Sequence, residues 1–324
     1  MGSGDFLAVP IVTGRSSPRR SFLLPGVYGQ GRLGSPSCLL LETPRRDMDQ
    51  GKPPSPPVNL NELPEDSPHV RAAIVALRCK AVEENLQVRQ LDLSDACLLR
   101  FLRCRDFDSN LAWKVLKNYH RWRRECPEIT TNLHPPSNLS LLQTGYFGIS
   151  KKRDPSGSRV IFYRIARWDP KIFTTDDLFR VSIMLSELIV RESDTQRNGT
   201  KTIFDLQGWK FAHAFQITPA VTKKIAFILT DGFPIKVREI HMIREPGIFY
   251  HVFNLIKHFL PEKIKARIHL HGNNFAHGLQ KHFPASLLPE EYNGEAGPFE
   301  EFSKELIDIL MESTDYLQSI SLLA

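Results

Sequence analysis

Apolar positions recur along this chain at two different spacings, and the change between them divides the sequence. From about residue 58 to 130 they return every three to four residues, which is typical of amphipathic helices. Ser94 and Asp108 are placed to cap two of these helices, and Pro127 ends the second. The side chains expected to face inward on them are Leu98, Leu99, Leu102, Leu111, Leu116 and Tyr119. This part of the chain therefore predicts a small all-α helical domain.

From about residue 140 the spacing changes, and short runs of β-branched and aromatic residues alternate with helical stretches. The predicted strands span 160–165, 202–206, 237–243 and 268–270. The predicted helices span about 175–195, 218–230 and 247–259, with a final helix at roughly 300–317. Strands separated by helices imply crossover connections, so we expect an α/β domain with a mixed, largely parallel sheet.

The first 57 residues follow neither spacing. They are rich in Gly, Pro, Ser and Arg, so we expect them to be flexible and outside the fold. Two explanations stay open: a transit peptide, or an upstream extension before a second start at Met48. The predicted division is an extension at 1–57, a helical domain at 58–133, the main domain at 134–299, and a C-terminal helix and tail at 300–324.

Composition narrows the class of protein. Hydrophobic residues fill 41% of the 324 positions, which is enough for a substantial core. The net charge of +6 is modest, and nothing in it indicates a nucleic-acid partner. Five cysteines without a C-x-x-C pair argue against a disulfide scaffold or a zinc ribbon and fit a reducing compartment. No run is long and apolar enough to span a membrane and no signal-peptide core is present, so we expect a cytoplasmic protein.

The sequence lacks the usual marks of an enzyme. It contains no G-x-x-x-x-G-K-[ST], G-x-S-x-G or H-E-x-x-H motif, and no G-x-G-x-x-G between a predicted strand and a predicted helix. Cys97 and Arg103 have the spacing of a cysteine phosphatase loop, but the residues between them include no glycine and suit a packed helix. We interpret this match as a coincidence. Because no nucleophile is paired with a base, no enzymatic activity is predicted.

Two further positions admit both a chemical and a structural interpretation. His269 and His271 would present two imidazoles on one face of a strand, as a metal site requires. No carboxylate or cysteine lies close by in sequence, so satisfied or surface histidines are favoured and no metal site is predicted. Asp205, at a strand end, is interpreted as a carboxylate that caps a turn near Gly208 rather than as a general acid or base.

The predicted helix near 248–260 is apolar over more than one face. Periodicity alone favours a core helix. Its surroundings favour a second interpretation, because seven basic residues against three acidic ones give a local charge of +4. The basic residues are Lys236, Arg238, Arg244, Lys257, Lys263, Lys265 and Arg267. An apolar helix rimmed by cations suits an anionic membrane surface, although a solvated charged edge is also consistent with this pattern.

Ser182 and Ser186 lie four residues apart in the helix predicted at 175–195, on the side that carries Phe179 and Val190. Serines at this spacing commonly donate a hydrogen bond to the carbonyl one turn earlier. The alternative is a lone hydroxyl in an apolar cavity that orients one polar group of a hydrophobic ligand. The residues themselves leave both interpretations open.

Several longer runs carry a resemblance to a known family. In order they are Gln196-Arg197-Asn198-Gly199, Ile203-Phe204-Asp205-Leu206-Gln207-Gly208-Trp209, Phe215-Gln216-Ile217-Thr218-Pro219, Phe233-Pro234-Ile235-Lys236-Val237-Arg238, Lys263-Ile264-Lys265-Ala266-Arg267-Ile268-His269 and His271-Gly272-Asn273-Asn274. Over about residues 58–320 the chain resembles the CRAL-TRIO lipid-transfer family. The resemblance implies a CRAL-TRIO lipid-binding domain, an α/β bowl that holds one hydrophobic molecule under a mobile amphipathic lid, and no cofactor beyond that lipid.

The ligand implied by the resemblance is α-tocopherol, carried between membranes. The positions implied around it are Phe179, Ser186, Thr200, Phe204, Ile217, Ile225, Ile228, Leu229, Ile235, Val237 and Ile240. Ser186, with the backbone carbonyls of Ile228 and Ile235, would meet the ligand hydroxyl through water. Thr200 departs from the aliphatic wall residue expected there, and this departure bears on ligand preference.

The resemblance also implies a lid and a membrane partner. The lid residues are Phe249, Val252, Phe253, Leu255, Ile256, Phe259 and Leu260. The cations implied to bind phosphoinositide head groups are Arg105, Lys236, Arg238, Lys263 and Arg267. A head group bound beside the lid would favour opening and release at endosomal or plasma membranes. The alternatives are a carrier of a retinoid or another isoprenoid, and a phosphoinositide-sensing membrane adaptor.

Overall fold

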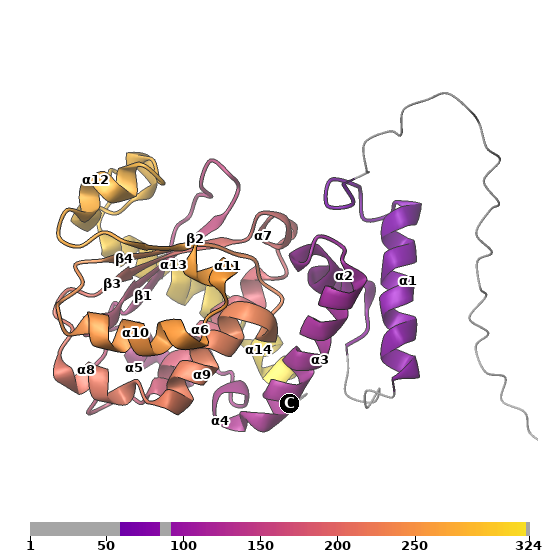
Figure 1. Cartoon of the computed structure of the whole chain (residues 1–324), viewed down its shortest axis with the longest axis horizontal. Helices are drawn as coiled ribbons and strands as arrows, with labels where there is room; N and C mark the ends of the chain where they lie inside the picture. Colours follow the sequence, from indigo (N-terminus) through magenta and orange to yellow (C-terminus); the bar gives the residue numbers. More distant parts are fainter. Residues whose placement is uncertain (1–58, 85–91, 322–324) are drawn as a thin grey trace, which may run out of the picture. The chain divides into compact units, whose positions relative to one another are not determined.

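The computed structural model describes residues 59–84 and 92–321 (Figure 1). All of them lie in one compact unit. The predicted extension at 1–57, with its second start at Met48, lies outside the described residues.

The leading helices are α1 (Pro68–Glu83), α2 (Asp95–Cys104), α3 (Ser109–Glu125) and α4 (Pro127–Thr130). Both predicted caps are confirmed, since Ser94 accepts from the Cys97 amide and Asp108 accepts from the amides of the first turn of α3. One inward position is wrong. Leu111 is 46% exposed, because the buried face of α3 runs through Ala112, Val115, Leu116 and Tyr119, and Leu111 lies beside that stripe in the first turn.

The main domain is built on a five-stranded sheet in the order β1-β2-β3-β4-β5. The strands are β1 (Phe147–Ile149), β2 (Arg159–Arg164), β3 (Thr200–Asp205), β4 (Val237–Ile243) and β5 (Ile268–Leu270). β1 pairs antiparallel with β2, and the other neighbours are parallel. The four predicted strands are confirmed. β1 was not predicted, because its three residues are all buried and show no alternation of apolar and polar positions.

Helices fill the connections between the strands. Between β1 and β5 they are α6 (Thr175–Ile189), α7 (Ser193–Asn198), α8 (Phe211–Gln216), α9 (Pro219–Phe227) with a π-helical turn (Ile228–Gly232), α10 (Phe249–Phe259) and α11 (Glu262–Lys265). α5 (Leu139–Leu142) precedes the sheet, and α12 (Phe275–Gln280), α13 (Phe299–Glu312) and α14 (Thr314–Ser321) follow it. The helix predicted at 175–195 is therefore two helices, as is the one predicted at 300–317.

The two faces of the sheet carry different layers. On β4, Ile240 and Met242 pack in apolar clusters with residues of α9 and α10, whereas Ile243 packs in a cluster with residues of α12 and α13. In Figure 1, α9 and α10 lie below the strands and α12 lies above them. Successive residues of one strand therefore face different sites.

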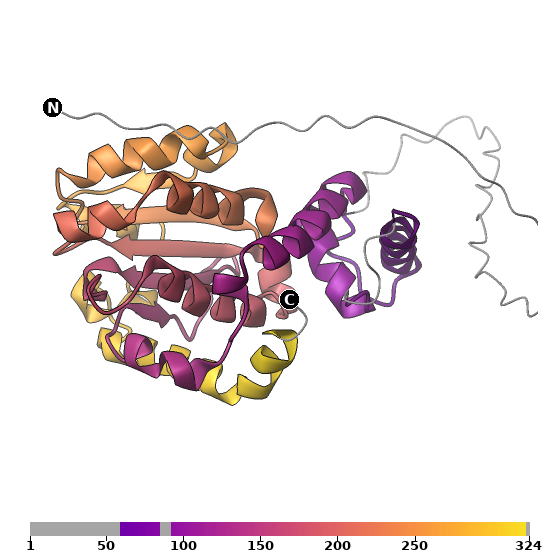
Figure 2. The same ribbon diagram turned by 90° about the horizontal axis from the view of Figure 1, so that it is seen from below.

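The C-terminal helices pack against the segment that links the helical domain to the sheet (Figure 2). The Leu133 amide donates to Ser321 Oγ at 3.2 Å, and an Arg123 nitrogen donates to the Ile320 carbonyl at 2.8 Å. These contacts join α3 and the segment after it to the end of the described chain.

Candidate functional site

An apolar interior lies between the sheet and the helices α9 and α10. Its central cluster contains buried Ala226, Val237, Ile240, Leu260 and Ile264. Partly buried residues packed against them include the predicted ligand positions Phe204, Leu229 and Ile235. Ile235 also packs against the large core cluster, where Phe179 and Ile228 are found. The structure thus links most of the predicted wall residues through contacting clusters.

The remaining wall positions lie around this interior. Ile217 packs with the α10 residues Phe249 and Phe253. Ile225 is half-buried on α9, and Thr200 is 3% exposed at the start of β3, where its amide donates to the Lys236 carbonyl at 2.8 Å. Eight of the eleven predicted wall residues, all except Thr200, Val237 and Ile240, are only partly buried.

The two serines of α6 follow the common pattern for helical serines. Ser186 Oγ donates to the Ser182 carbonyl at 2.8 Å, and Ser182 Oγ donates to the Leu178 carbonyl at 2.8 Å. This arrangement uses the donor of Ser186 but leaves its oxygen able to accept a hydrogen bond. Ser186 can therefore meet a ligand hydroxyl as an acceptor.

The predicted lid segment, 249–260, has an inward face and an exposed edge. Phe249 and Phe253 are buried, with ring centroids 5.7 Å apart. Leu255 and Phe259 are 36% and 39% exposed. Of the other lid positions, Val252 and Ile256 are half-buried, and Leu260 is buried just after the helix.

Two exposed aromatic residues on α8 were missed by the sequence analysis. Phe211 is 66% exposed and Phe215 is 79% exposed. Their spacing of four residues places both on one face of the helix. That spacing was the available signal, but α8 is too short to show a clear period.

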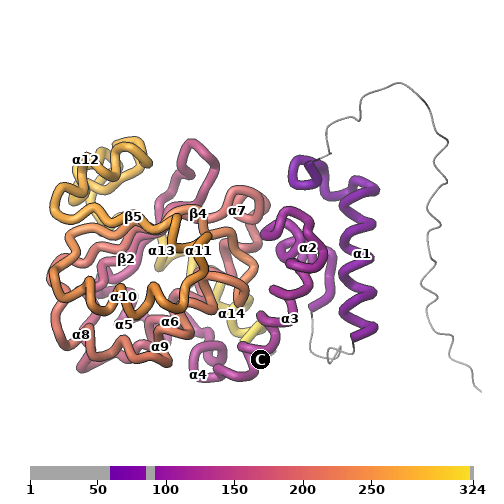
Figure 3. Tube along the Cα trace, viewed as in Figure 1, coloured from indigo at the N-terminus to yellow at the C-terminus, as the bar shows by residue number. Residues whose placement is uncertain are grey.

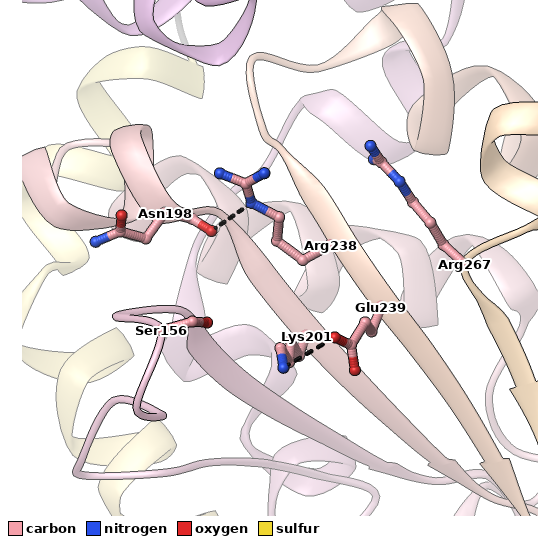
Figure 4. Close-up of a pocket in the computed structure, with 6 residues that line it drawn as sticks. All are labelled: Ser156, Asn198, Lys201, Arg238, Glu239 and Arg267. Atoms are coloured by element: carbon pink, nitrogen blue, oxygen red, sulfur yellow. Dashed lines mark hydrogen bonds and ion pairs between the residues drawn. The ribbon is translucent and has the colours of Figure 1, made fainter. Parts of the chain in front are cut away.

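A polar pocket opens at the edge of the sheet where β3, β4 and β5 begin (Figure 4). Its volume is about 330 Å³. Its lining residues are Ser156, Asn198, Lys201, Arg238, Glu239 and Arg267. Two of the five predicted head-group cations, Arg238 and Arg267, are among them. Arg238 Nε donates to the Asn198 carbonyl at 2.8 Å, and Arg267 donates to the Val237 carbonyl.

The cations around this pocket influence one another. Burial lowers the pKa of Arg267, and the positive charges of Arg238 and Arg105 lower it further. Burial also lowers the pKa of Lys236, although Asp106, 2.6 Å from its Nζ, opposes that shift. Arg105 donates to the Thr230 carbonyl at 2.5 Å. A group of cations held this close favours an anionic ligand.

The fifth predicted cation, Lys263, lies exposed on α11. Four lining residues of the pocket were not predicted: Ser156, Asn198, Lys201 and Glu239. Lys201 lies 3.0 Å from Asp154 and 3.0 Å from Glu239, so its own charge is balanced by two carboxylates. No sequence signal placed these residues together, because they come from separate connections and strands.

The two candidate catalytic features are structural. Cys97 is buried in α2, and burial raises the pKa of its thiol to about 12, so it is not an activated nucleophile. Asp205 accepts from the Gln207 amide at 3.0 Å and lies 3.2 Å from Arg244. Both outcomes agree with the sequence interpretation.

Known proteins support the same architecture. The CRAL/TRIO domain model matches residues 142–294, and the CRAL/TRIO N-terminal domain model matches residues 69–118. The protein "Alpha-tocopherol transfer protein-like" of Mus musculus is 34% identical over 82% of this chain and 80% of its own length. The protein of the same name from Homo sapiens is 36% identical over 76% of this chain and 75% of its own length.

More distant relatives include "Clavesin-1" of Xenopus laevis, 29% identical over 65% of this chain and 64% of its own length. A solved structure, "Crystal structure of Sfh5", covers 78% of this chain and 99% of its own with a TM-score of 0.52 and 13% identity, which indicates a shared fold. Within residues 59–84 and 92–321, every helix falls short of the length and apolarity that crossing a membrane requires. The chain belongs to the CRAL/TRIO family, whose members bind and transfer lipids and are not enzymes.

Proposed function

We propose that this protein binds α-tocopherol between its sheet and the helices α9 and α10 and carries it between membranes, with phosphoinositide binding assisting release. The observation that carries the proposal is the apolar interior itself. Side chains such as Phe204, Ile235 and Ile256 pack in apolar clusters yet remain partly exposed. Partial exposure of contacting apolar side chains suits a surface whose remaining partner is a hydrophobic ligand.

The energetics assign different roles to the wall and to the hydroxyl. Burying a branched chain of roughly sixteen carbons at about 0.8 kcal/mol per methylene is worth on the order of 10 kcal/mol. A water-mediated hydrogen bond between a ligand hydroxyl and Ser186 contributes about 1 kcal/mol net. The wall residues would therefore supply the affinity, and Ser186 would orient the polar ring.

Membrane contact would use two surfaces. The exposed aromatic residues Phe211, Phe215 and Phe259 suit insertion into the interfacial region of a bilayer. The pocket lined by Arg238 and Arg267 suits the phosphates of a phosphoinositide head group. Arg267 follows the lid segment in the chain and directly precedes β5. A head group bound to Arg267 would therefore lie near the end of the segment that has to open.

The first experiment is native mass spectrometry of the protein purified from its own tissue, followed by identification of the bound molecule. One α-tocopherol per chain is the expected result. If the bound molecule is a retinoid or another isoprenoid, the proposed ligand is wrong. This alternative is considered because Thr200 places a buried hydroxyl at a position where an aliphatic wall residue is expected. A chain with no lipid that still docks on phosphoinositide vesicles would favour a membrane adaptor.

A transfer assay separates carrier from adaptor. Phe179→Ala, in the wall, is expected to reduce transfer of α-tocopherol between vesicles while vesicle docking stays unchanged. An equal loss of docking would contradict the assignment of Phe179 to the ligand wall.

A further inference from the structure

Four metal-ligating side chains meet on the face of the sheet opposite the lipid interior. Glu239 and His241 belong to β4, His269 belongs to β5, and His282 follows α12. One ligand atom from each lies within 4.8 Å of all the others. We propose that these four residues bind a zinc ion, which none of the related proteins' names suggests.

The distances between the ligand atoms suit tetrahedral coordination of an ion once the side chains move slightly. His241 Nε2 and His282 Nδ1 each lie 2.9 Å from the same carboxylate oxygen, Glu239 Oε2. The His269 ring centroid lies 4.8 Å from that of His241 and 4.7 Å from that of His282. A zinc ion holds nitrogen and oxygen ligands at about 2.0 to 2.2 Å, which sets ligand atoms roughly 3.3 Å apart. The Glu239 contacts would lengthen by a few tenths of an ångström as the ion enters.

The sheet positions three of the four ligands. β4 and β5 pair in parallel with His241 directly opposite His269. Glu239 precedes His241 by two residues, so both project from the same face of β4. The trace in Figure 3 shows β5 beside β4, and the chain reaches β5 from α11. Ligands on paired strands are held more precisely than ligands on loops.

The fourth ligand is held by the core beneath it. His282 adjoins Phe283, which is buried in the cluster that also contains Leu279 and Ile243. The Phe283 ring centroid lies 4.9 Å from that of His241. This packing keeps His282 at the site and places the apolar ring of Phe283 beside it.

The chemistry of the donor set favours zinc. Three imidazoles and one carboxylate form a common ligand set for this ion. His241 is 0% exposed, and its Nε2 faces Glu239 Oε2 at 2.9 Å. His271 Nε2 lies 3.0 Å from His241 Nδ1. With zinc on His241 Nε2, the proton would sit on Nδ1 and be donated to His271, which would then orient the ligand.

The positive charge of Lys201 opposes the binding of a cation at this site. Lys201 Nζ lies 3.0 Å from Glu239 Oε1, the oxygen that does not contact the histidines. The same lysine lies 3.0 Å from Asp154, which offsets its charge. Lys201 therefore orients Glu239 with Oε2 toward the three rings. The opposing hypothesis is a hydrogen-bonded cluster in which His241 and His282 donate to Glu239 and no metal binds.

The test is calorimetric titration of the full chain, stripped by a chelator, with Zn²⁺ alone. We expect one Zn²⁺ per chain and a melting temperature that rises with Zn²⁺ concentration. His269→Ala and His282→Ala, both at half-buried positions, should each weaken binding by at least about tenfold. The matched control is His277→Ala, an exposed histidine on α12 outside the cluster, which should bind Zn²⁺ like the unaltered chain.

A second measurement uses only the unaltered chain, so it does not require any variant to fold. Co²⁺ bound to the unaltered chain should show the intense visible absorption of a four-coordinate site rather than the weak absorption of a six-coordinate one. The proposal is overturned if the unaltered chain takes up no stoichiometric Zn²⁺, if Co²⁺ is six-coordinate, or if His277→Ala weakens binding as much as the two cluster variants. The test contains no lipid, so its outcome is separate from that of the carrier proposal.

Discussion

Arg238 and Arg267 line the same pocket, and each donates to a backbone carbonyl, that of Asn198 for the first and that of Val237 for the second. The charge of Arg238 contributes to lowering the pKa of Arg267. Two guanidinium groups placed this way retain most of their positive potential for an external anion. An anionic head group that bridges them would remove the repulsion between them.

Charge reversal at these arginines should weaken binding to vesicles that contain phosphoinositide. Near an anionic surface each basic residue is worth about 1 kcal/mol, so reversing one charge should cost roughly 30-fold in affinity. Arg238→Glu and Arg267→Glu are the variants, and sedimentation with phosphoinositide vesicles is the measurement. Lys304→Glu makes the same charge change at an exposed position on α13 and should have a much smaller effect. Equal losses in all three would indicate a general charge effect rather than a pocket.

Neutralising the acid of the same pocket should act in the opposite direction. Glu239 is the acidic residue among the six that line it. Glu239→Gln removes one negative charge near the bound head group, so affinity for phosphoinositide vesicles should rise about fivefold by the same reasoning. The assay is run with a chelator present, which separates this effect from any metal bound by Glu239. Unchanged or lower affinity would place the head group elsewhere.

The exposed phenylalanines of α8 should contribute apolar binding energy to any membrane. Transferring a phenylalanine side chain out of water is worth about 1.5 to 3 kcal/mol, so Phe215→Ser should weaken binding to neutral vesicles by at least about tenfold. Phe215 is 79% exposed, and its replacement should leave the melting temperature unchanged. Val75→Ser, at a 52% exposed position on α1, is the control and should bind normally. If Val75→Ser weakened binding equally, α8 would not be the docking surface.

The parallel strands could be predicted from the sequence because a stretch with helical periodicity lies between each strand and the next. A helix between two strands implies a crossover connection, and crossover connections join parallel strands. It did not reveal β1, whose pairing with β2 is antiparallel and whose residues are buried on both faces. The histidine cluster was missed for a different reason. Sequence proximity was the only guide to a ligand set, and Glu239 and His282 approach His269 only through strand pairing and the return of the chain after α12.

The cationic pocket was predicted in part for the same reason. Arg238 and Arg267 were placed by resemblance, but Lys201 and Glu239 form an ion pair between neighbouring strands that no local pattern indicates. Strand register, which depends on the packing of both faces, decides such contacts.

A buried ion pair between α3 and α6 should be important for stability. Arg123 Nη1 lies 2.8 Å from Glu187 Oε1, and Tyr119 donates to the same oxygen at 2.6 Å. Glu187→Gln would leave the Arg123 charge buried without its partner, which should lower the free energy of unfolding by about 3 to 5 kcal/mol. Urea denaturation is the measurement. The control is Glu84→Gln, which breaks an exposed pair with Lys117 and should cost less than about 1 kcal/mol.

Ser186 and Ser182 offer a matched pair for testing how the ligand is oriented. Both hydroxyls donate to a carbonyl one turn earlier at 2.8 Å, so each alanine variant loses one such bond. Ser182 also hydrogen-bonds the hydroxyl of Tyr163, so Ser182→Ala should be the less stable of the two variants. Only Ser186 is proposed to bond the ligand hydroxyl, through a water molecule, and losing about 1 kcal/mol should weaken α-tocopherol binding roughly fivefold in Ser186→Ala alone. Fluorescence titration with the ligand measures this difference. Equal losses in the two variants would mean that the hydroxyl of Ser186 acts through the helix rather than on the ligand.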